Sequence, residues 1–500
     1  MAYRGNIVPI MPTKGINTSL GPEMIGDDYV VSAQNYRFRD GDWTQRKGYA
    51  LYDDDAVAAS TAITGMFQAL FSGGTTSFLV CTGTDIYKLS SGTWTSVKGA
   101  LTLDGNATYL NSFCVLNDLI IGVNGKNQIW KYNAATDPAV AVSGTPPSTA
   151  IALLSFYNRV LALSANGTLY WSTINNPDDW TSAYAGSAAP GLKTGQYGIA
   201  LGSVGEDAFI FMSGSIWRVN YTGDSKAPFV FRIHDTATGC CGRQTVATVP
   251  DRGLLFFANY QGIYTMQAPG FTPVRISQPL DGVGGIWESI NKTKLSQISA
   301  ITNPAKNEVW FSCTLTSGTT NSIVLVYDYD RQTWTTFTGI NASTLANFQD
   351  GNGDIRVFHG DHSGYIYDND SGTSDNGTLI DAYVTSKAYP LVDGFNGARV
   401  TFVRLFHDLQ SSQGDFEFGY GYDLSGITNT KMIPQGIGGA LWDTAIWDSA
   451  MWATTAQVCT DRNLSGGGHH FQFQLRSRTL NILSRVYKII LGVKPIGRKK

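Results

Sequence analysis

A short hydrophobic run, a glycine-rich or polar turn, and an aliphatic residue followed by an aromatic one recur in this order seven times along the chain. Successive pairs start 43, 40, 47, 47, 63 and 40 residues apart. The seven pairs are Ile86-Tyr87, Ile129-Trp130, Leu169-Tyr170, Ile216-Trp217, Ile263-Tyr264, Val326-Tyr327 and Ile366-Tyr367. A period of about 40–50 residues is typical of the blades of a β-propeller.

The run upstream of each pair predicts a strand buried on both faces, because it is short, apolar and bounded by Gly, Asn, Asp or Ser. The runs are Phe78–Val80, Leu119–Ile121, Val160–Leu163, Phe209–Met212, Leu254–Phe257, Val309–Phe311 and Val357–Phe358. A blade cannot bury its own faces and must pack radially against its neighbours. We therefore predict an all-β fold with a β-propeller of about seven blades. Counts of six or eight stay open, because ring closure can borrow a strand from a flanking region.

The repeat divides the chain into three predicted regions. Residues 1–60 form an N-terminal arm with a β-hairpin, residues 61–375 the propeller, and residues 376–500 a C-terminal antiparallel β-sandwich-like domain with a basic tail. Strands in the last region are expected at Ile380–Val384, Val400–Phe406, Phe416–Tyr422, Phe471–Leu475 and Val486–Leu491. Within the longest repeat interval, Pro279 and the helical spacing of Ile286, Trp287 and Ile290 predict a short helix over residues 277–294.

The hairpin of the arm spans Asn35–Tyr49, where aromatic and charged residues alternate on both sides of an Asp-Gly turn. Its basic side chains Arg37, Arg39 and Arg46 are interpreted as a solvated face of the hairpin, or alternatively as a contact with a partner subunit.

Three tryptophans, Trp442, Trp447 and Trp452, follow one another at a period of five in the C-terminal region. Five matches neither the strand period nor the helical one, which indicates successive turns or an extended loop. Each ring buries roughly 150–250 Å² when packed. We expect the three to pack on the chain's own sandwich or on a neighbouring subunit. The alternative is a tip that meets a cell envelope or a sugar.

Charge and composition narrow the function classes. Charged residues make up 15% of the chain and its formal net charge is −3, against about 25% charged residues in average soluble domains. A DNA-reading role is disfavoured, although passive passage of DNA along a near-neutral wall is not. The chain has no apolar run of about 18 residues and its N-terminus lacks the apolar core of a signal peptide. We expect synthesis in the host cytoplasm and no stable insertion into a membrane.

The sequence offers little catalytic or metal-binding chemistry. Ser164–Trp171 is the nearest match to the Asp-box of propeller sialidases, but it lacks the aspartate and misplaces the glycine. Asp350–Asp361 resembles a calcium loop with isoleucine where the sharp turn needs glycine. The six cysteines and six histidines show no ligand spacing. We predict no enzyme activity, no catalytic residues, no cofactor and no metal.

Three motifs in order resemble a known family. They are Pro12–Thr18, the Asn-x-Arg-Phe-Arg-Asp-Gly core and following Arg-Lys-Gly within Asn35–Gly48, and Tyr170–Ser172 leading into Asn176–Trp180. Together they resemble the tail nozzle, or packaged-DNA stabilisation, proteins of short-tailed bacteriophages. The resemblance implies a structural protein of the virion tail. It would be a homohexameric ring below the portal and its adaptor protein that retains packaged double-stranded DNA and forms the channel for its ejection, with tail fibre or needle proteins as further partners.

Two other functions compete with this one. A glycan-binding or depolymerising tail protein would use a pocket on one face of the propeller, and a monomeric scaffold would bind protein partners outside any virion. Rings with a central channel, seen by electron microscopy, would distinguish the nozzle from both.

Overall fold

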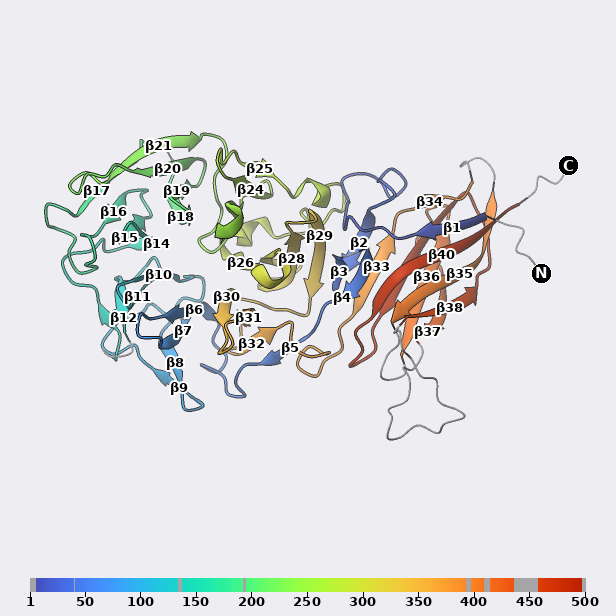
Figure 1. Cartoon of the computed structure of the whole chain (residues 1–500), viewed down its shortest axis with the longest axis horizontal. Coiled ribbons are helices and arrows are strands. Elements are labelled where there is room, and N and C mark those ends of the chain that lie inside the picture. Colours follow the sequence, from blue (N-terminus) through green and yellow to red (C-terminus); the bar gives the residue numbers. More distant parts are fainter. Residues whose placement is uncertain are drawn as a thin grey trace.

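The protein consists of a β-propeller and a β-sandwich that lie side by side (Figure 1). The structure is a computed structural model and describes residues 6–39, 41–133, 137–191, 195–392, 397–408, 414–435 and 457–496. The prediction of an all-β fold is confirmed. Among the described residues no helix is long and apolar enough to cross a membrane.

The propeller has seven blades, each an antiparallel sheet of four strands counted outward from the axis. Blades 1 to 3 are β6 (Ile63–Leu70), β7 (Thr76–Thr82), β8 (Ile86–Ser90), β9 (Thr93–Ser96); β10 (Ser112–Leu116), β11 (Leu119–Val123), β12 (Trp130–Tyr132), β13 (Val140–Ala141); and β14 (Ala150–Phe156), β15 (Arg159–Ser164), β16 (Leu169–Trp171), β17 (Gly186–Ala188). Blades 4 and 5 are β18 (Gly198–Val204), β19 (Asp207–Met212), β20 (Ile216–Tyr221), β21 (Phe229–Asp235); and β22 (Ala247–Val249), β23 (Leu254–Ala258), β24 (Ile263–Gln267), β25 (Val274–Arg275). Blades 6 and 7 are β26 (Ser299–Asn303), β27 (Glu308–Thr314), β28 (Asn321–Asp328), β29 (Thr333–Thr338); and β30 (Thr344–Gln349), β31 (Ile355–Gly360), β32 (Ile366–Asn369), β5 (Tyr49–Leu51).

Each unit of the sequence repeat corresponds to one blade. The hydrophobic run lies in the second strand, and the aliphatic-aromatic pair lies at or in the third. Every aliphatic member is at most 2% exposed, and each belongs to a different hydrophobic cluster, one between each blade and the next. The aliphatic residue of each repeat therefore makes the packing contact between neighbouring blades.

Two features account for the long interval of 63 residues: the segment of turns and 3₁₀ helices between β25 and β26, and a longer hairpin in blade 6. In blade 1 the pair opens the third strand, with Ile86 opposite Cys81. In blade 6 the hairpin between β27 and β28 is longer, so Val326 lies well inside β28, opposite Trp310. The residues from Thr314 to Asn321 connect these two strands.

Ring closure uses a strand from the arm. β5 pairs antiparallel with β32 as the outermost strand of blade 7, with Ala50 opposite Asp368. On the inner side, β30 packs against β6 of blade 1. Two distant parts of the chain thus hold the ring closed, and the number of blades is seven.

The sandwich is made of two sheets. One contains β3 (Tyr36–Arg39), β4 (Asp42–Gln45), β40 (Arg485–Pro495), β35 (Ala398–Asp408) and β38 (Gln457–Asn463) in this order, with β1 (Asn6–Ile10) also paired to β40. The other continues from blade 6 through β2 (Val30–Gln34), β33 (Ala382–Ser386), β39 (His470–Ser477), β36 (Asp415–Tyr422) and β37 (Asn429–Pro434), with β34 (Tyr389–Pro390) paired to β39. The five strands predicted in this region are all present, with shifted ends at Ile380–Val384.

The arm joins the two bodies. β2 pairs in parallel with β29 of the propeller and antiparallel with β33 of the sandwich. The predicted hairpin forms as β3 and β4, and it lies in the sandwich sheet beside β40. The hydrophobic core of blades 5 and 6 is continuous with that of the sandwich. Propeller and sandwich are therefore linked through both shared strands and a shared core.

The short helix predicted over residues 277–294 is wrong for most of its length. Two 3₁₀ helices, η2 (Gln278–Leu280) and η3 (Lys292–Gln297), enclose a series of turns. Gly282 and Gly284 adopt positive φ angles of 107° and 75°, which an α-helix does not tolerate. Trp287 and Ile290 are nevertheless buried in the core, which accounts for their apolar spacing.

Candidate functional site

Arg37 of the hairpin is buried against the rim of the propeller. Its Nε lies 2.7 Å from Glu308 at the start of β27, and its Nη1 lies 2.8 Å from Asp370 just after β32. A second hydrogen bond from Nη2 reaches each carboxylate, and the guanidinium lies 4.9 Å from the centre of the Phe337 ring. One arginine of the arm thus joins blade 6 to blade 7.

Arg46 makes a second junction of the same kind. Its Nη1 and Nη2 donate to the two carboxylate oxygens of Asp375 at 2.7 and 2.6 Å, and its Nε donates to Asn35 at 2.8 Å. The two remaining donors reach the backbone oxygens of Thr338 and Lys47. All five guanidinium donors are therefore used within the chain. We call Arg37, Arg46, Glu308, Asp370 and Asp375 the arm clamp.

Arg39 lies at the edge of the arm clamp. Its Nη2 donates to Glu308 at 2.8 Å and to the backbone oxygen of Lys306. Its Nε is buried without a hydrogen-bond partner, 4.0 Å from Asp328. The side chain is 22% exposed, against 5% for Arg37 and 2% for Arg46.

The solvated face expected for these arginines is wrong for Arg37 and Arg46, which are buried within the chain. The alternative, a contact of Arg37, Arg39 and Arg46 with a partner subunit, stays a prediction. The hairpin turns this side toward the propeller, where carboxylates distant in sequence meet it. Glu308 is 271 residues from Arg37, and Asp375 is 329 residues from Arg46. No local pattern in the sequence signals such pairs.

Trp442, Trp447 and Trp452 lie outside the described residues, so the prediction for them stays a prediction.

The electrostatics of the arm clamp favour its charged form. Burial alone would lower the pKa of Arg37, but Asp370 and Glu308 raise it above its ordinary value. Burial alone would likewise raise the pKa of Asp370, and the positive charges of Arg37 and Lys306 hold it below its ordinary value. Removing one partner of such a buried pair costs about 3–5 kcal/mol, because the other charge is left unpaired in the interior. The arm clamp is therefore a structural feature rather than a catalytic one.

A side chain bridges several blades at the axis of the propeller. A cavity of about 280 Å³ is lined by residues from all seven innermost strands, and Gln244, in the loop before β22, reaches across it. Its Nε2 donates to the backbone oxygens of Thr64 and Asn111 at 3.2 and 2.9 Å, and its Oε1 accepts from Thr344 at 2.9 Å. The side chain ties blade 5 to blades 1, 2 and 7.

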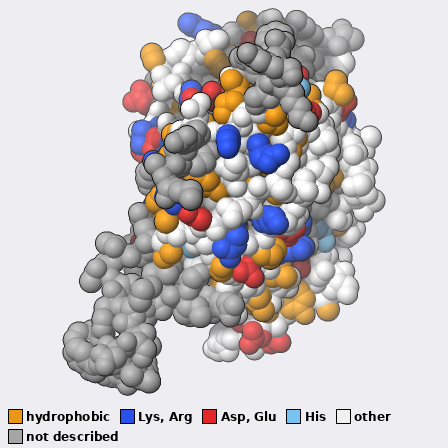
Figure 2. Space-filling model, turned by 90° about the vertical axis from the view of Figure 1, so that its right-hand side faces the viewer, with side chains coloured by type: hydrophobic (Ala, Val, Ile, Leu, Met, Phe, Trp, Pro, Cys, Tyr) orange, Lys and Arg blue, Asp and Glu red, His pale blue; other side chains and the backbone are white. Residues whose placement is uncertain are grey.

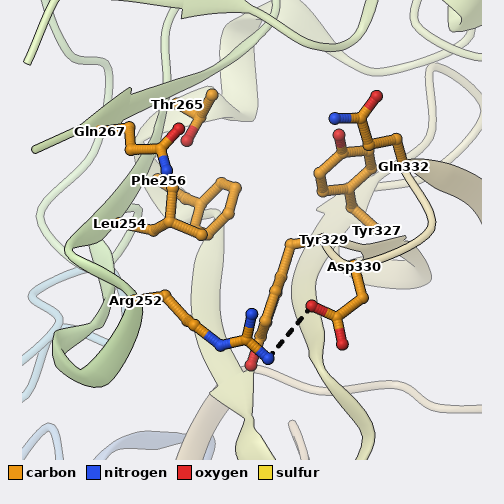
Figure 3. Close-up of a pocket in the computed structure, with 9 residues that line it drawn as sticks. All are labelled: Arg252, Leu254, Phe256, Thr265, Gln267, Tyr327, Tyr329, Asp330 and Gln332. Carbon is orange, nitrogen blue, oxygen red and sulfur yellow. Dashed lines mark ion pairs between the residues drawn. The ribbon is translucent and has the colours of Figure 1, made fainter.

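A pocket of about 240 Å³ lies between blades 5 and 6 (Figure 3). Arg252 and Asp330 face each other at its mouth, 3.3 Å apart, and both are substantially exposed. Burial and nearby carboxylates raise the pKa of Tyr329 to about 12, and burial and Asp328 raise that of Tyr327 to about 12. Both phenols stay protonated at neutral pH and cannot act as bases there. The pocket offers an exposed ion pair and an aromatic wall, but no nucleophile next to a base.

The histidines and acids considered for metal binding have other roles. His359 is buried, bonded to Asn369 at 2.9 Å, and burial lowers its pKa to about 3. Asp350 accepts hydrogen bonds from its own turn and pairs with Arg356 at 3.2 Å. Within the described ranges, no three residues of the ligand types gather closely enough to hold a metal ion.

The cysteines are free thiols. Cys81, Cys114 and Cys313 are buried, as expected of small hydrophobic residues in strands. The adjoining Cys240 and Cys241 are also buried, and burial raises the pKa of both thiols. A raised pKa disfavours the reactive thiolate.

Comparison with known proteins adds no family. No family model and no curated protein matches the chain. Among solved structures, the WD40 β-propeller domain of Doa1 is 11% identical, with a TM-score of 0.42 over 64% of this chain and 97% of that one. The computationally designed Ika8 protein is 12% identical, with a TM-score of 0.40 over 73% and 99% of the two chains. BBS1N, in a complex with ARL6DN, is 10% identical, with a TM-score of 0.42 over 65% and 97%.

Proposed function

We propose that the chain is a structural subunit of a short-tailed bacteriophage tail, forming a homohexameric nozzle below the portal and its adaptor protein. In this role it retains packaged DNA and forms the channel for its ejection, and tail fibre or needle proteins bind to it. The proposal begins from the sequence motifs that resemble nozzle proteins. One structural observation supports it most: one sheet face of the sandwich carries lysine and arginine side chains that make no ion pair with any residue that the structure describes.

That face belongs to the sheet of β40, β35 and β38. Val403, Leu405 and Leu491 point into the core, so their neighbours in each strand point outward. The outward positions include Arg399, opposite Lys494, and Phe406, opposite Lys488. No ion pair joins Arg399, Lys488 or Lys494 to any residue that the structure describes. We call Arg399, Lys488 and Lys494 with the outward positions beside them the basic sheet face.

Figure 2 looks onto the sandwich end and shows lysine and arginine side chains there, together with acidic, apolar and uncharged ones. The chain as a whole has a formal net charge of −3. A ring built head to tail needs two different, complementary surfaces on each subunit. In the proposed ring, the basic sheet face is one of these surfaces and an acidic surface of the neighbouring subunit is the other.

The propeller fits the role of a rigid outer body. Gln244 ties blade 5 to blades 1, 2 and 7 at the propeller axis, and the arm clamp ties the arm to blades 6 and 7. The conduit of the proposed ring would lie between subunits, where low charge lets DNA slide because few phosphate contacts form.

Electron microscopy and native mass spectrometry of the purified chain test this proposal. We expect six-fold rings with a central channel, and the double change Lys488→Glu and Lys494→Glu should convert them to folded monomers. Lys226→Glu, on an exposed loop of blade 4, is the matched control and should leave the rings intact. Monomers at every concentration, together with absence of the chain from phage particles, would reject the nozzle.

A further inference from the structure

A hollow of about 400 Å³ lies on the propeller face where the innermost strands begin. It is lined by segments at the start of β10, β14, β18, β22 and β26 and by the turns after β15 and β23, so it lies beside the axis, over blades 2 to 5. Its volume is within the range of about 300–1,000 Å³ that small-molecule sites occupy. We call it the axial pocket.

Arg243 lines the axial pocket and has no acidic partner. Its Nη1 donates to the backbone oxygen of Asn124, and it makes no ion pair with any described residue. The described lining of the pocket contains no Asp or Glu and no Lys. Burial lowers the pKa of Arg243, with only Tyr109 opposing that effect. A half-buried cation without a counter-charge is unfavourable, and an anion bound beside it would remove that cost.

The surroundings hold the guanidinium in place. A Cβ atom on Gly125 would come within 2.3 Å of Arg243 Nη1, so the guanidinium lies directly against the bare backbone of that glycine. Gly125 has a φ of +80°, which also favours glycine. The arginine is therefore positioned before any ligand arrives.

The chemistry of the pocket selects among anions. A single planar guanidinium matches a carboxylate, which it binds with two parallel hydrogen bonds. A phosphate dianion would need more positive charge than the described lining supplies. Tyr197 and Tyr260 stand at the pocket with exposures of 48% and 59%, and each presents an apolar ring face with a hydroxyl at its end. Such rings suit a sugar, which has both apolar faces and hydroxyl groups.

We propose that the axial pocket binds a carboxylate-bearing sugar unit of an acidic polysaccharide, with the carboxylate on Arg243 and the sugar ring against Tyr197 and Tyr260. The site goes beyond the structural role proposed above. It lies wholly in the propeller and uses no residue of the basic sheet face, so binding and ring assembly can be tested separately.

The pocket of Figure 3 supplies a matched control. It also combines an arginine with tyrosines, but Arg252 is already paired with Asp330. If any arginine beside aromatic rings could bind the sugar, the two sites would behave alike. If the missing counter-charge matters, only the pocket with Arg243 should bind the acidic sugar.

The test uses the full chain, with calorimetry and ligand-observed NMR. The probes are methyl glucuronide and methyl sialoside, compared with methyl glucoside, sodium acetate and N-acetylglutamate amide. We expect saturable binding of at least one acidic sugar, and at least tenfold weaker binding of methyl glucoside. Arg243→Gln should weaken the binding of the acidic sugar at least tenfold, whereas Arg252→Gln should change that binding less than twofold.

A second variant covers the case in which Arg243→Gln fails to fold. Tyr260→Ala changes an exposed side chain. It should weaken the binding of the acidic sugar and leave the weak binding of acetate unchanged. Equal binding of methyl glucoside, or absence of binding by both acidic sugars, would overturn the proposal. Tighter binding of N-acetylglutamate amide would also overturn it, because the occupant would then be an acidic protein side chain.

Discussion

Arg46 and Asp375 are separated by 329 residues and are joined by two hydrogen bonds of 2.7 and 2.6 Å. The first residue follows the arm hairpin, and the second follows the last strand of the repeat region. Their pairing ties the beginning of the propeller region to its end, next to the point where β5 closes blade 7. The arm is therefore an integral part of the propeller rather than an appendage.

Changing Arg46 should strongly destabilise the protein. Arg46→Gln leaves Asp375 buried with an unpaired charge, and we expect the free energy of unfolding to fall by about 3–5 kcal/mol. Urea unfolding followed by tryptophan fluorescence measures the change. Arg252→Gln removes an exposed pair and should cost about 0–1 kcal/mol. Equal effects of the two variants would mean that the arm clamp is not a stabilising contact.

Asp370 should make the stability of the protein depend on acid pH. Its pKa in the folded state lies below its ordinary value because of Arg37 and Lys306, so its stabilising contribution is complete above the unfolded pKa of about 3.9. That contribution is lost as the pH falls through the folded pKa.

Asp370→Asn should therefore lower stability at pH 7 and flatten its dependence on pH below about pH 4. Unfolding in urea at a series of pH values gives both quantities. Asp54→Asn, at an exposed position without an ion pair to a described residue, should leave the curve unchanged. A variant curve parallel to that of the wild type would contradict the role of Asp370.

Gly48 should tolerate no side chain. A Cβ atom there would lie 1.8 Å from the backbone oxygen of Ser374, and the backbone of Gly48 bonds to Gly372 and Ser371 in the same segment. Gly48→Ala must displace backbone, and we expect a loss of about 1–3 kcal/mol. Gly351→Ala meets no atom within 4 Å and should be nearly neutral. Thermal unfolding of both variants measures the difference.

Gln244 should stabilise the centre of the propeller. Gln244→Ala leaves the backbone oxygens of Thr64 and Asn111 without this donor, and such a loss costs about 1–3 kcal/mol when the groups remain buried. Hydrogen exchange at the innermost strands should increase at the same time. Gln267→Ala, at an exposed position of β24, is the control and should change neither measurement.

Much of the fold could be predicted because it is repeated. Each of the seven aliphatic-aromatic pairs marks one blade, because every blade buries the aliphatic residue of its pair against a neighbouring blade. The strands of the sandwich were also predictable from their apolar patterns, with Val400–Phe406 and Phe416–Tyr422 as examples. The predicted helix over residues 277–294 failed because apolar spacing around Trp287 reports burial, which turns can also provide.

The candidate sites were much less predictable. Arg37 and Arg46 look like surface residues in sequence, since their partners Glu308, Asp370 and Asp375 lie hundreds of residues away. Arg243 and Gln244 follow the unusual Cys240-Cys241-Gly242 segment, yet nothing there indicates that one lines the axial pocket and the other spans the axis. Both roles arise only when loops from several blades meet.

By itself, the sequence determined the all-β class, the repeat of seven units and the change of pattern near residue 376, because these follow from local hydrophobic periodicity. The tertiary structure alone decided that β5 closes the ring, that blade 6 continues into the sandwich, and that Arg243 has no counter-charge among the described residues. Those features depend on which distant segments come together. Ion pairs and strand pairings between distant residues stabilise the fold, but they produce no periodic pattern in the sequence.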